Sequence, residues 1–180
     1  MHIRHSAGRQ NTTEIVDLKD GKEYAAVAIV LLRNKIIIEK RTSAKNDPWA
    51  GQFSLPGGHY SKGDKTLRDT AIRETLEETG IDLKEGSDYL GHFGPFVPGN
   101  RHNLEVYAYV FELHEPRPLV PSEESEYLLW VGLSELLPFN GDYGKSFKIE
   151  AGVVWGLTER IIENFLELYD LDTNKAGNSF

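Results

Sequence analysis

The segment Tyr24–Leu32 constrains the fold more than any other part of the chain. Its sequence, YAAVAIVLL, is apolar without alternation. A strand that is buried on one face alternates apolar and polar residues, whereas an uninterrupted apolar run is typical of a strand buried on both faces. The run is also far too short to span a bilayer. The sequence therefore predicts a central strand that other elements must cover on both sides.

Further elements that could supply this cover follow along the chain. Residues 33–35 predict a turn, and the predicted strands after it are 36–40, 89–96, 104–113 and 127–131. A short helical turn is expected at 133–137, then a polar loop. The last helix carries Leu157, Ile161, Phe165 and Leu168 on one face. This order predicts an α/β fold in which a mixed β-sheet lies between helical layers.

Length and composition indicate one domain without disulfides. A chain of 180 residues can bury roughly 70% of its unfolded surface in a single core. We expect an N-terminal arm at 1–20, the domain at 21–171 and a flexible tail at 172–180. There are no cysteines, which excludes disulfides, thiol catalysis and cysteine-ligated zinc. The histidines show no zinc-binding spacing.

The charge balance bears on partners and location. The net charge is −8 at pH 7, which argues against a nucleic-acid or anionic membrane surface, because basic patches supply the affinity there. An acidic protein can still bind a polyphosphate if metal ions bridge the two. The first residues, MHIRHSAGRQNTTE, contain no hydrophobic signal-peptide core, so a cytoplasmic location is the default expectation.

An acidic helix is predicted from about residue 65 to residue 79. Helical spacing places Glu74 and Glu78 about 40° apart and Glu77 about 60° from Glu74, so the three carboxylates share one face. Like charges at this spacing cost roughly 0.2–0.5 kcal/mol per pair. Arg73 offsets Glu77, but no neighbour in the sequence neutralises the Glu74/Glu78 pair. A hard divalent cation would neutralise it.

Taken alone, glutamates on one helix indicate a solvated surface more often than a metal site. The turn at Gly57-Gly58 changes that balance, because glycines let the main chain approach a metal or a phosphate closely. Asp64 or Thr66 is expected to cap the helix, and Gly80 to end it. The glycine turn and the acidic helix together predict a site.

This segment resembles the signature of the Nudix hydrolases, G-x5-E-x7-R-E-U-x-E-E-x-G-U, in which U is a bulky aliphatic residue. Gly58 opens the signature here, and it is closed by Arg73, Glu74, Glu77, Glu78, Gly80 and Ile81. Asp64 stands where the family has its first glutamate, and eight residues instead of seven separate it from Arg73. Thr75 occupies the first U position. The longer loop with an aspartate is similar to the subgroup that cleaves coenzyme A.

The resemblance extends over roughly residues 24–168. The segments Trp49–Gln52, Ser122–Val131 and Val154–Thr158, the last of which is expected to open the final helix, are similar to coenzyme A-type members. One position departs from that subgroup, which has an arginine where this chain has Asp47. The family implies a Nudix-type alpha/beta/alpha sandwich with a mixed β-sheet.

The resemblance also implies roles for particular residues. Glu74, Glu77 and Glu78 would hold Mg²⁺ or Mn²⁺, with the Gly57 or Gly58 carbonyl as a further ligand. Arg73 would position the glutamates. The base would be Glu77 or a loop carboxylate such as Glu124, and the sequence does not choose between them.

Three further residues have two readings each. Glu124 belongs either to a solvated acidic loop, which we favour, or to a loop that delivers a metal-linked carboxylate. Arg41 would bind a substrate phosphate or form a surface ion pair. Trp49, next to the proposed site, is a core residue or a platform for the substrate. The Arg101-His102 turn is better interpreted as a polar turn than as a substrate contact.

The implied reaction is hydrolysis of a diphosphate that links a nucleoside to another moiety. Coenzyme A or an acyl-coenzyme A is the first expectation, and ADP-ribose or a nucleotide sugar is the alternative. Two other classes stay open: a non-catalytic Nudix domain that senses a nucleotide, and an acidic structural domain without a ligand. The expected partner is a small-molecule nucleotide diphosphate, neither nucleic acid nor membrane, and a homodimer is left open.

Overall fold

The computed structural model describes residues 16–43 and 49–168, whose main element is a seven-stranded sheet. Its strands are β1 (Glu23–Leu32), β2 (Lys35–Arg41), β3 (Phe53–Ser54), β4 (Gly57–His59), β5 (Ser87–Phe96), β6 (Leu104–Leu113) and β7 (Ser125–Gly132). β1 runs parallel to β6, and the other pairings in this sheet are antiparallel. The predicted mixed sheet is therefore confirmed.

β1 is the central strand. The order along the sheet is β3-β2-β1-β6-β5, with β4 also paired to β1 and β7 to β2. Ala28, Ile29 and Val30 are all buried, although successive side chains point to opposite faces. The apolar run that predicted a strand covered on both sides has that environment.

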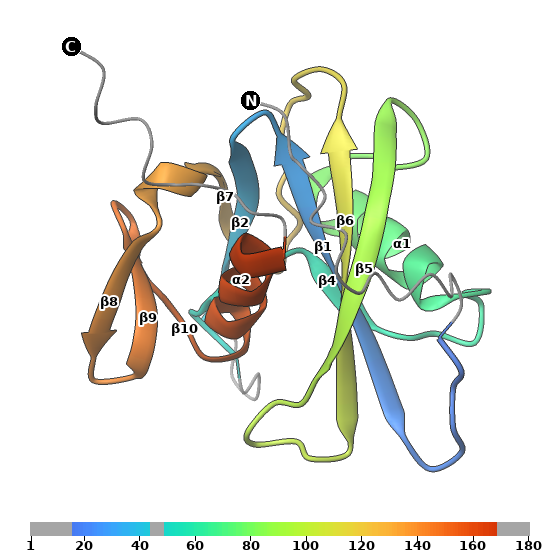
Figure 1. Ribbon diagram of the computed structural model, residues 1–180. Coiled ribbons are helices and arrows are strands. Elements are labelled where there is room, and N and C mark those ends of the chain that lie inside the picture. Colours follow the sequence, from blue (N-terminus) through green and yellow to red (C-terminus); the bar gives the residue numbers. More distant parts are fainter. Residues whose placement is uncertain (1–15, 44–48, 169–180) are drawn as a thin grey trace.

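Two helices supply the cover, α1 (Leu67–Thr79) and α2 (Gly156–Leu168). Figure 1 shows α2 on the near side of the sheet and α1 on the far side. Ile29 packs in one core with Phe165 of α2, and Val30 packs in a second core with Ala71 of α1. The helices and the sheet therefore form the predicted three-layer sandwich.

Local sequence explains where α1 begins and ends. Thr66 is the N-cap, and its hydroxyl accepts a hydrogen bond from the Asp69 amide while the Asp69 carboxylate accepts one from the Thr66 amide. Gly80 ends the helix in the left-handed conformation with φ 74°, which glycine adopts without strain. Of the two expected caps, Thr66 is correct, and Asp64 is left for another role.

The prediction of a polar loop before the last helix is wrong. It contains a second sheet made of β8 (Leu137–Gly141), β9 (Gly144–Ile149) and β10 (Gly152–Trp155), drawn in orange beside α2 in Figure 1. Phe147 and Ile149 pack into the core that contains Phe165 of α2, and this burial stabilises the short strands. We call this cluster the α2-side core. Val154 and Trp155 belong to β10, so α2 begins at Gly156 and not at Val154 as expected.

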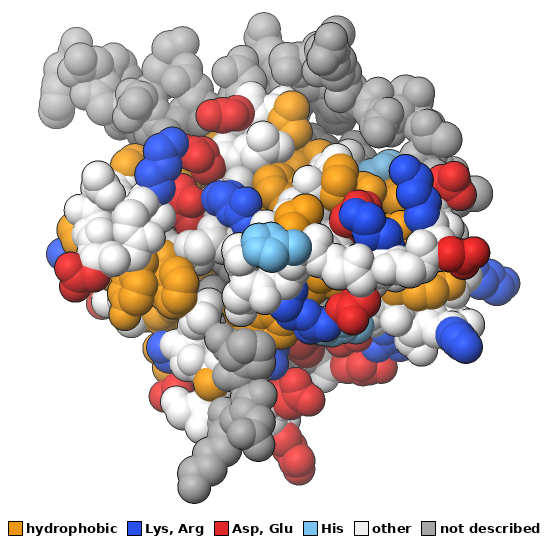
Figure 2. All heavy atoms as spheres, turned by 90° about the horizontal axis from the view of Figure 1, so that it is seen from below, with side chains coloured by type: hydrophobic (Ala, Val, Ile, Leu, Met, Phe, Trp, Pro, Cys, Tyr) orange, Lys and Arg blue, Asp and Glu red, His pale blue; other side chains and the backbone are white. Residues whose placement is uncertain are grey.

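The predicted N-terminal arm and C-terminal tail fall mostly outside the described residues. Residues 1–15 of the predicted arm and the whole predicted tail, 172–180, lie outside the described residues, as does Asp47. Within residues 16–43 and 49–168, no helix is long and apolar enough to cross a membrane. On the face seen from below, described acidic and basic side chains lie interspersed among apolar ones (Figure 2).

Candidate active site

The glycine turn lies directly against the acidic helix. β4 pairs with the middle of β1 and brings Gly57 and Gly58 over α1. A Cβ atom on Gly57 would lie 2.3 Å from the Ala26 carbonyl oxygen, and one on Gly58 would lie 2.5 Å from the carboxyl carbon of Glu74. The Gly57 amide donates to Glu78 Oε2 at 2.7 Å. A side chain at Gly57 would clash with the backbone of β1, so only glycine fits there, whereas a side chain at Gly58 would displace the Glu74 carboxylate.

A cavity of about 340 Å³ opens beside this contact. Its wall combines elements that are far apart in the sequence. Among the predicted site residues, those that line it are Arg41, Trp49, Gly57, Gly58, Glu74, Glu78 and Glu124. The rest of its wall consists of His59 and of apolar side chains, Leu104 and Leu157 among them. The structure therefore gathers the sequence-predicted residues, apart from Arg73 and Glu77, around one hollow.

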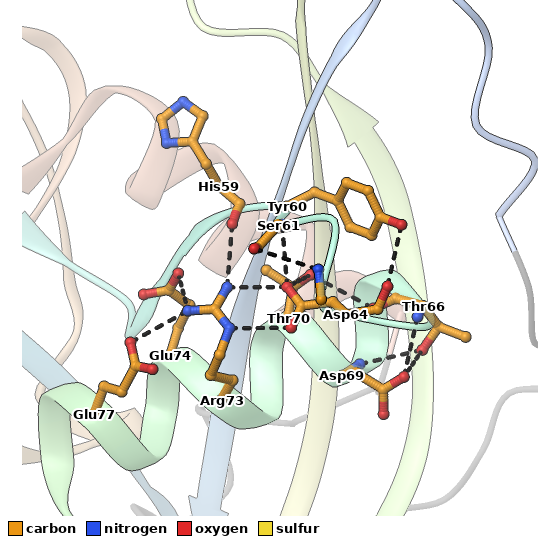
Figure 3. Close-up of polar contacts among 11 residues, drawn as sticks. His59, Tyr60, Ser61, Asp64, Thr66, Asp69, Thr70, Arg73, Glu74 and Glu77 are labelled. Carbon is orange, nitrogen blue, oxygen red and sulfur yellow. Dashed lines mark hydrogen bonds and ion pairs between the residues drawn. The ribbon is translucent and has the colours of Figure 1, made fainter.

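Arg73 joins the loop, the turn and the helix (Figure 3). Its guanidinium binds Asp64 through two parallel hydrogen bonds of 3.0 Å each, from Nε to Oδ1 and from Nη2 to Oδ2. Nη2 also donates to the His59 carbonyl at 3.3 Å, and Nη1 lies 2.7 Å from Glu74 Oε1 and 3.2 Å from Glu77 Oε2. The expected pairing with Glu77 is present, but it is one of several.

The expectation that the Glu74/Glu78 pair has no neutralising neighbour is wrong. Adjacent residues on a helix do not normally face each other, so helical spacing does not predict a pairing of Arg73 with Glu74. The guanidinium turns toward Asp64 and the His59 carbonyl, and this path carries Nη1 past Glu74. Arg73 therefore offsets part of the helix's negative charge.

Asp64 holds the loop between the glycine turn and α1. Its carboxylate is almost fully buried and also accepts from Thr70 Oγ1 at 2.9 Å and from the Ser61 amide at 3.1 Å. The hydrogen bonds from Arg73 hold the pKa of Asp64 below its usual range, against the opposing effect of burial. Asp64 is therefore an ionised anchor for Arg73, outside the residues that line the cavity.

Asp64→Ala is expected to cost about 2–4 kcal/mol of unfolding free energy near pH 7, because Arg73 loses its bidentate partner in a partly buried setting. Because the pKa of Asp64 is lower in the folded than in the unfolded protein, its ionised form stabilises the fold at pH values above the unfolded-state pKa. This stabilisation is lost as the pH falls through the pKa of the folded state. The gap to wild type should therefore narrow below about pH 4. Urea unfolding measures it, with exposed Glu85→Ala as control. A loss no larger than the control's would contradict the anchoring role.

Glu78 is the most perturbed group of the site. It is 6% exposed, and burial, with the nearby Glu39 carboxylate adding to it, raises its pKa to about 9. The Gly57 amide and the Arg41 guanidinium, 3.9 Å from Oε1, oppose this shift without cancelling it. Burial also raises the pKa of Glu74, opposed mainly by Arg73. A buried carboxyl group that resists ionisation gains most from a cation placed beside it.

The donor set fits a hard divalent cation. Glu74 and Glu78 offer carboxylate oxygens at the cavity wall, the ligand type that Mg²⁺ and Mn²⁺ prefer. Glu77 is more exposed and its carboxylate faces Arg73. Within residues 16–43 and 49–168, no three His, Asp or Glu side chains converge closely enough to hold a metal ion. The metal roles of the three glutamates stay a prediction.

Arg41 lies among three carboxylates at the cavity wall. Its guanidinium nitrogens are 4.0 Å from Glu39, 3.9 Å from Glu78 and 3.7 Å from Glu124. Arg41 therefore forms ion pairs and also lines the cavity, and its binding of a substrate phosphate stays a prediction. Glu124 has a side chain that is 74% exposed, yet it reaches the same cavity.

Sequence reasoning missed Glu39, which is completely buried. Its signal was a charged residue inside the otherwise apolar stretch IIIEK of β2. The turn interpreted as polar carries Arg101, which contacts the cavity-lining residues His59 and Trp49. Arg101 Nη1 lies 3.0 Å from His59 Nε2, its guanidinium is 5.7 Å from the centre of the Trp49 ring, and it is ion-paired with Glu23. Burial, followed by the Arg101 charge, lowers the pKa of His59.

Comparisons with known proteins show the family of the chain. The NUDIX domain family matches residues 22–148. An ADP-ribose pyrophosphatase from Methanocaldococcus jannaschii is 35% identical over 82 residues, 41% of this chain and 46% of that protein. Nudix hydrolase 22 (chloroplastic) of Arabidopsis thaliana is 29% identical over 169 residues, 77% of this chain and 52% of that protein. The chain thus spans about half the length of these two relatives.

Among solved structures, the NUDIX domain of Shewanella oneidensis NrtR complexed with ADP ribose has the same fold. Its TM-score is 0.60 at 17% identity, over 83% of this chain and 89% of that one. A likeness at this identity concerns the arrangement of the sheet and helices and does not extend to the residues of the site.

Proposed function

Because the chain belongs to the Nudix family, we propose that it is a metal-dependent diphosphatase that hydrolyses a nucleoside diphosphate linked to another moiety. One observation supports this most strongly. The buried Glu78 carboxyl group, held by the Gly57 amide, shares a cavity wall with Glu74 and Arg41. Carboxylates for a cation and a guanidinium for a phosphate are the groups that a diphosphate needs.

Each residue has a distinct task in this proposal. Glu74 and Glu78 would hold Mg²⁺ or Mn²⁺, and such an ion would neutralise phosphate charge and make the attacking water more acidic. Arg41 binds a non-bridging phosphate oxygen. Arg73, tied to Asp64, keeps the Glu74 and Glu77 side chains oriented.

The general base accepts a proton from the attacking water. Two carboxylates are candidates, Glu77 on the helix and Glu124 in the loop before β7. Glu124 lines the cavity and Glu77 does not, which favours Glu124. Its carboxylate lies 3.7 Å from Arg41, which is proposed to bind the phosphate, and is accessible to a water beside it.

We propose coenzyme A or an acyl-coenzyme A as the substrate, with ADP-ribose as the alternative. The aspartate spacing and the Trp49–Gln52 segment support coenzyme A. Trp49 at the cavity wall, with the Arg101 guanidinium 5.7 Å from its ring centre, offers aromatic surface to the non-reacting part of such a molecule. The relative named ADP-ribose pyrophosphatase supports the alternative, and so does Asp47, which would repel an added phosphate.

A side-by-side measurement of kcat/KM separates these substrates. With Mg²⁺ or Mn²⁺ present, coenzyme A is expected to exceed both dephospho-coenzyme A and ADP-ribose, because a site built to pair the 3′-phosphate leaves its partners unsatisfied without it. Product masses should match 3′,5′-ADP and 4′-phosphopantetheine. A preference of tenfold or more for ADP-ribose would remove the coenzyme A proposal and leave the diphosphatase.

A nucleotide-sensing domain without catalysis is the second candidate. The observation that favours it is the fold shared with the NUDIX domain of NrtR, which was solved in complex with ADP ribose. Such a domain would gain thermal stability with ADP-ribose, about 2.7 kcal/mol at 100 Kd, and release no product. An acidic structural domain would show neither effect.

A further inference from the structure

Glu39 is the most deeply buried charged side chain of the described residues, with 0% exposure. Its Oε2 accepts a hydrogen bond from Ser54 Oγ at 3.1 Å, and its Oε1 accepts one from Ser125 Oγ at 2.6 Å. Burying a carboxylate is costly unless hydrogen bonds compensate it. The two hydroxyls come from different elements, Ser54 from β3 and Ser125 from the start of β7. The Glu39 carboxylate of β2 therefore joins two of the three strands that pair with β2.

The Ser125 contact reaches the loop that carries Glu124. Ser122 Oγ lies 3.3 Å from Ser125 Oγ and accepts from the Glu124 amide at 3.2 Å. The Glu124 carbonyl accepts from the Thr42 amide at 2.9 Å. The pairing of β2 with β7 also shifts register here, so the ladder alone does not hold this end of β7 regularly. The Glu39–Ser125 hydrogen bond is the buried attachment point beside Glu124.

The same carboxylate faces Arg41. The Arg41 guanidinium lies 4.0 Å from Glu39 Oε2 and 3.7 Å from Glu124 Oε2. A negative charge buried beneath the cavity wall favours one position of the guanidinium over the others that a long side chain can take.

We propose that Glu39 is a positioning residue for the phosphate-cleaving site. It anchors Ser125, and through Ser125 the Glu124 carboxylate, and it holds Arg41 toward the cavity. This inference rests on the proposed function, because it assigns Glu124 and Arg41 work in the reaction. Glu39 itself acts through these neighbours and lies outside the set of cavity-lining residues.

Ser125→Ala is the first test, since it removes one hydrogen bond and keeps the carboxylate. With the best substrate and saturating Mg²⁺, kcat is expected to fall about fivefold to tenfold with KM within twofold. The change should act through Glu124. In a Glu124→Gln background, Ser125→Ala should therefore lower kcat by less than twofold further, because residues that act as a unit are not additive.

Ser54→Ala is the matched control. It removes the same kind of hydrogen bond from the other oxygen of Glu39, Oε2, which has no hydrogen bond to the loop that carries Glu124. Ser54→Ala should change kcat by the same factor in the wild type and in the Glu124→Gln background. The proposal would be overturned if Ser125→Ala also changed kcat by the same factor in both backgrounds, or if the two serine variants lost kcat equally.

Glu39→Gln tests the Arg41 half. The amide keeps Glu39's size and can satisfy both serine hydroxyls if one of them accepts, but it lacks the charge that faces Arg41. KM is expected to rise about tenfold, with kcat reduced less than threefold. A kcat loss with unchanged KM would overturn this half of the proposal.

Hydrogen exchange gives a readout that does not need activity. Amide exchange in the segment 122–126 should accelerate at least fivefold in Ser125→Ala and stay unchanged in Ser54→Ala. Unchanged exchange in Ser125→Ala overturns the anchoring, whatever the kinetics. If the wild-type protein hydrolyses no diphosphate with either metal, the proposed function fails and the catalytic part of this inference fails with it. The exchange rates still decide whether Glu39 holds the loop.

Discussion

Glu78→Gln is expected to lower kcat/KM for the best diphosphate substrate by about 10²–10³-fold at saturating Mg²⁺. Glutamine keeps the size of the side chain and can still accept the Gly57 hydrogen bond, but it cannot supply a charged oxygen to a cation. The matched control is Glu85→Gln, an exposed glutamate away from the cavity, which should retain wild-type kinetics. Wild-type turnover by Glu78→Gln would show that the metal assignment is wrong.

The same substitution should stabilise the metal-free protein at high pH. The pKa of Glu78 is about 9 in the folded protein, whereas an unperturbed glutamate has a pKa of 4.5. Between these two pH values the folded state therefore retains a proton that the unfolded state has released. The group's contribution to the free energy of unfolding therefore falls as pH rises from about 4.5 toward 9. Glutamine removes this dependence. We expect Glu78→Gln to exceed wild type by on the order of 2 kcal/mol at pH 8, and by little at pH 5.

Urea unfolding in EDTA at both pH values measures this difference. The loss of activity and the gain in stability should occur in one variant, which separates a missing ligand from a damaged fold. A Glu78→Gln protein that is less stable than wild type at pH 8 would contradict the buried, protonated state of this residue.

Phe165→Ala is expected to destabilise the protein by about 3–5 kcal/mol, because it leaves a cavity in the α2-side core. Phe165 is 0% exposed and packs in the same cluster as Ile29 of the central strand. Leu76→Ala on α1 is the control, since that side chain is 45% exposed and its truncation should cost less than about 1 kcal/mol. The midpoint of urea unfolding reports both. Equal costs for the two variants would contradict the placement of the core.

Some features of this fold are local, and the sequence alone determined them. The run Tyr24–Leu32 predicted a strand buried on both faces, and the structure has that strand at the centre of the sheet. Thr66 and Gly80 bound the acidic helix because capping depends on residues within a few positions of the helix end. Gly57-Gly58 marked the turn for the same reason.

The second sheet could not be predicted from local sequence. β8 and β9 are short, and much of their surface is exposed, so their polar residues resemble a loop. Phe147 and Ile149 make them strands by packing into a core whose other residues lie far away in the sequence. The stabilising contact is tertiary, and it overrides the weak local signal.

The charges of the site divide along the same line. Helical spacing placed Glu74, Glu77 and Glu78 on one face, but the pairing of Arg73 with Asp64 and Glu74 depends on the path of the loop before α1. The Glu39–Ser125 hydrogen bond joins positions 86 residues apart. The raised pKa of Glu78 comes from burial beneath a turn that only the folded sheet brings there. Spacing along a helix is a local property, whereas burial and long-range pairing exist only once the layers have packed.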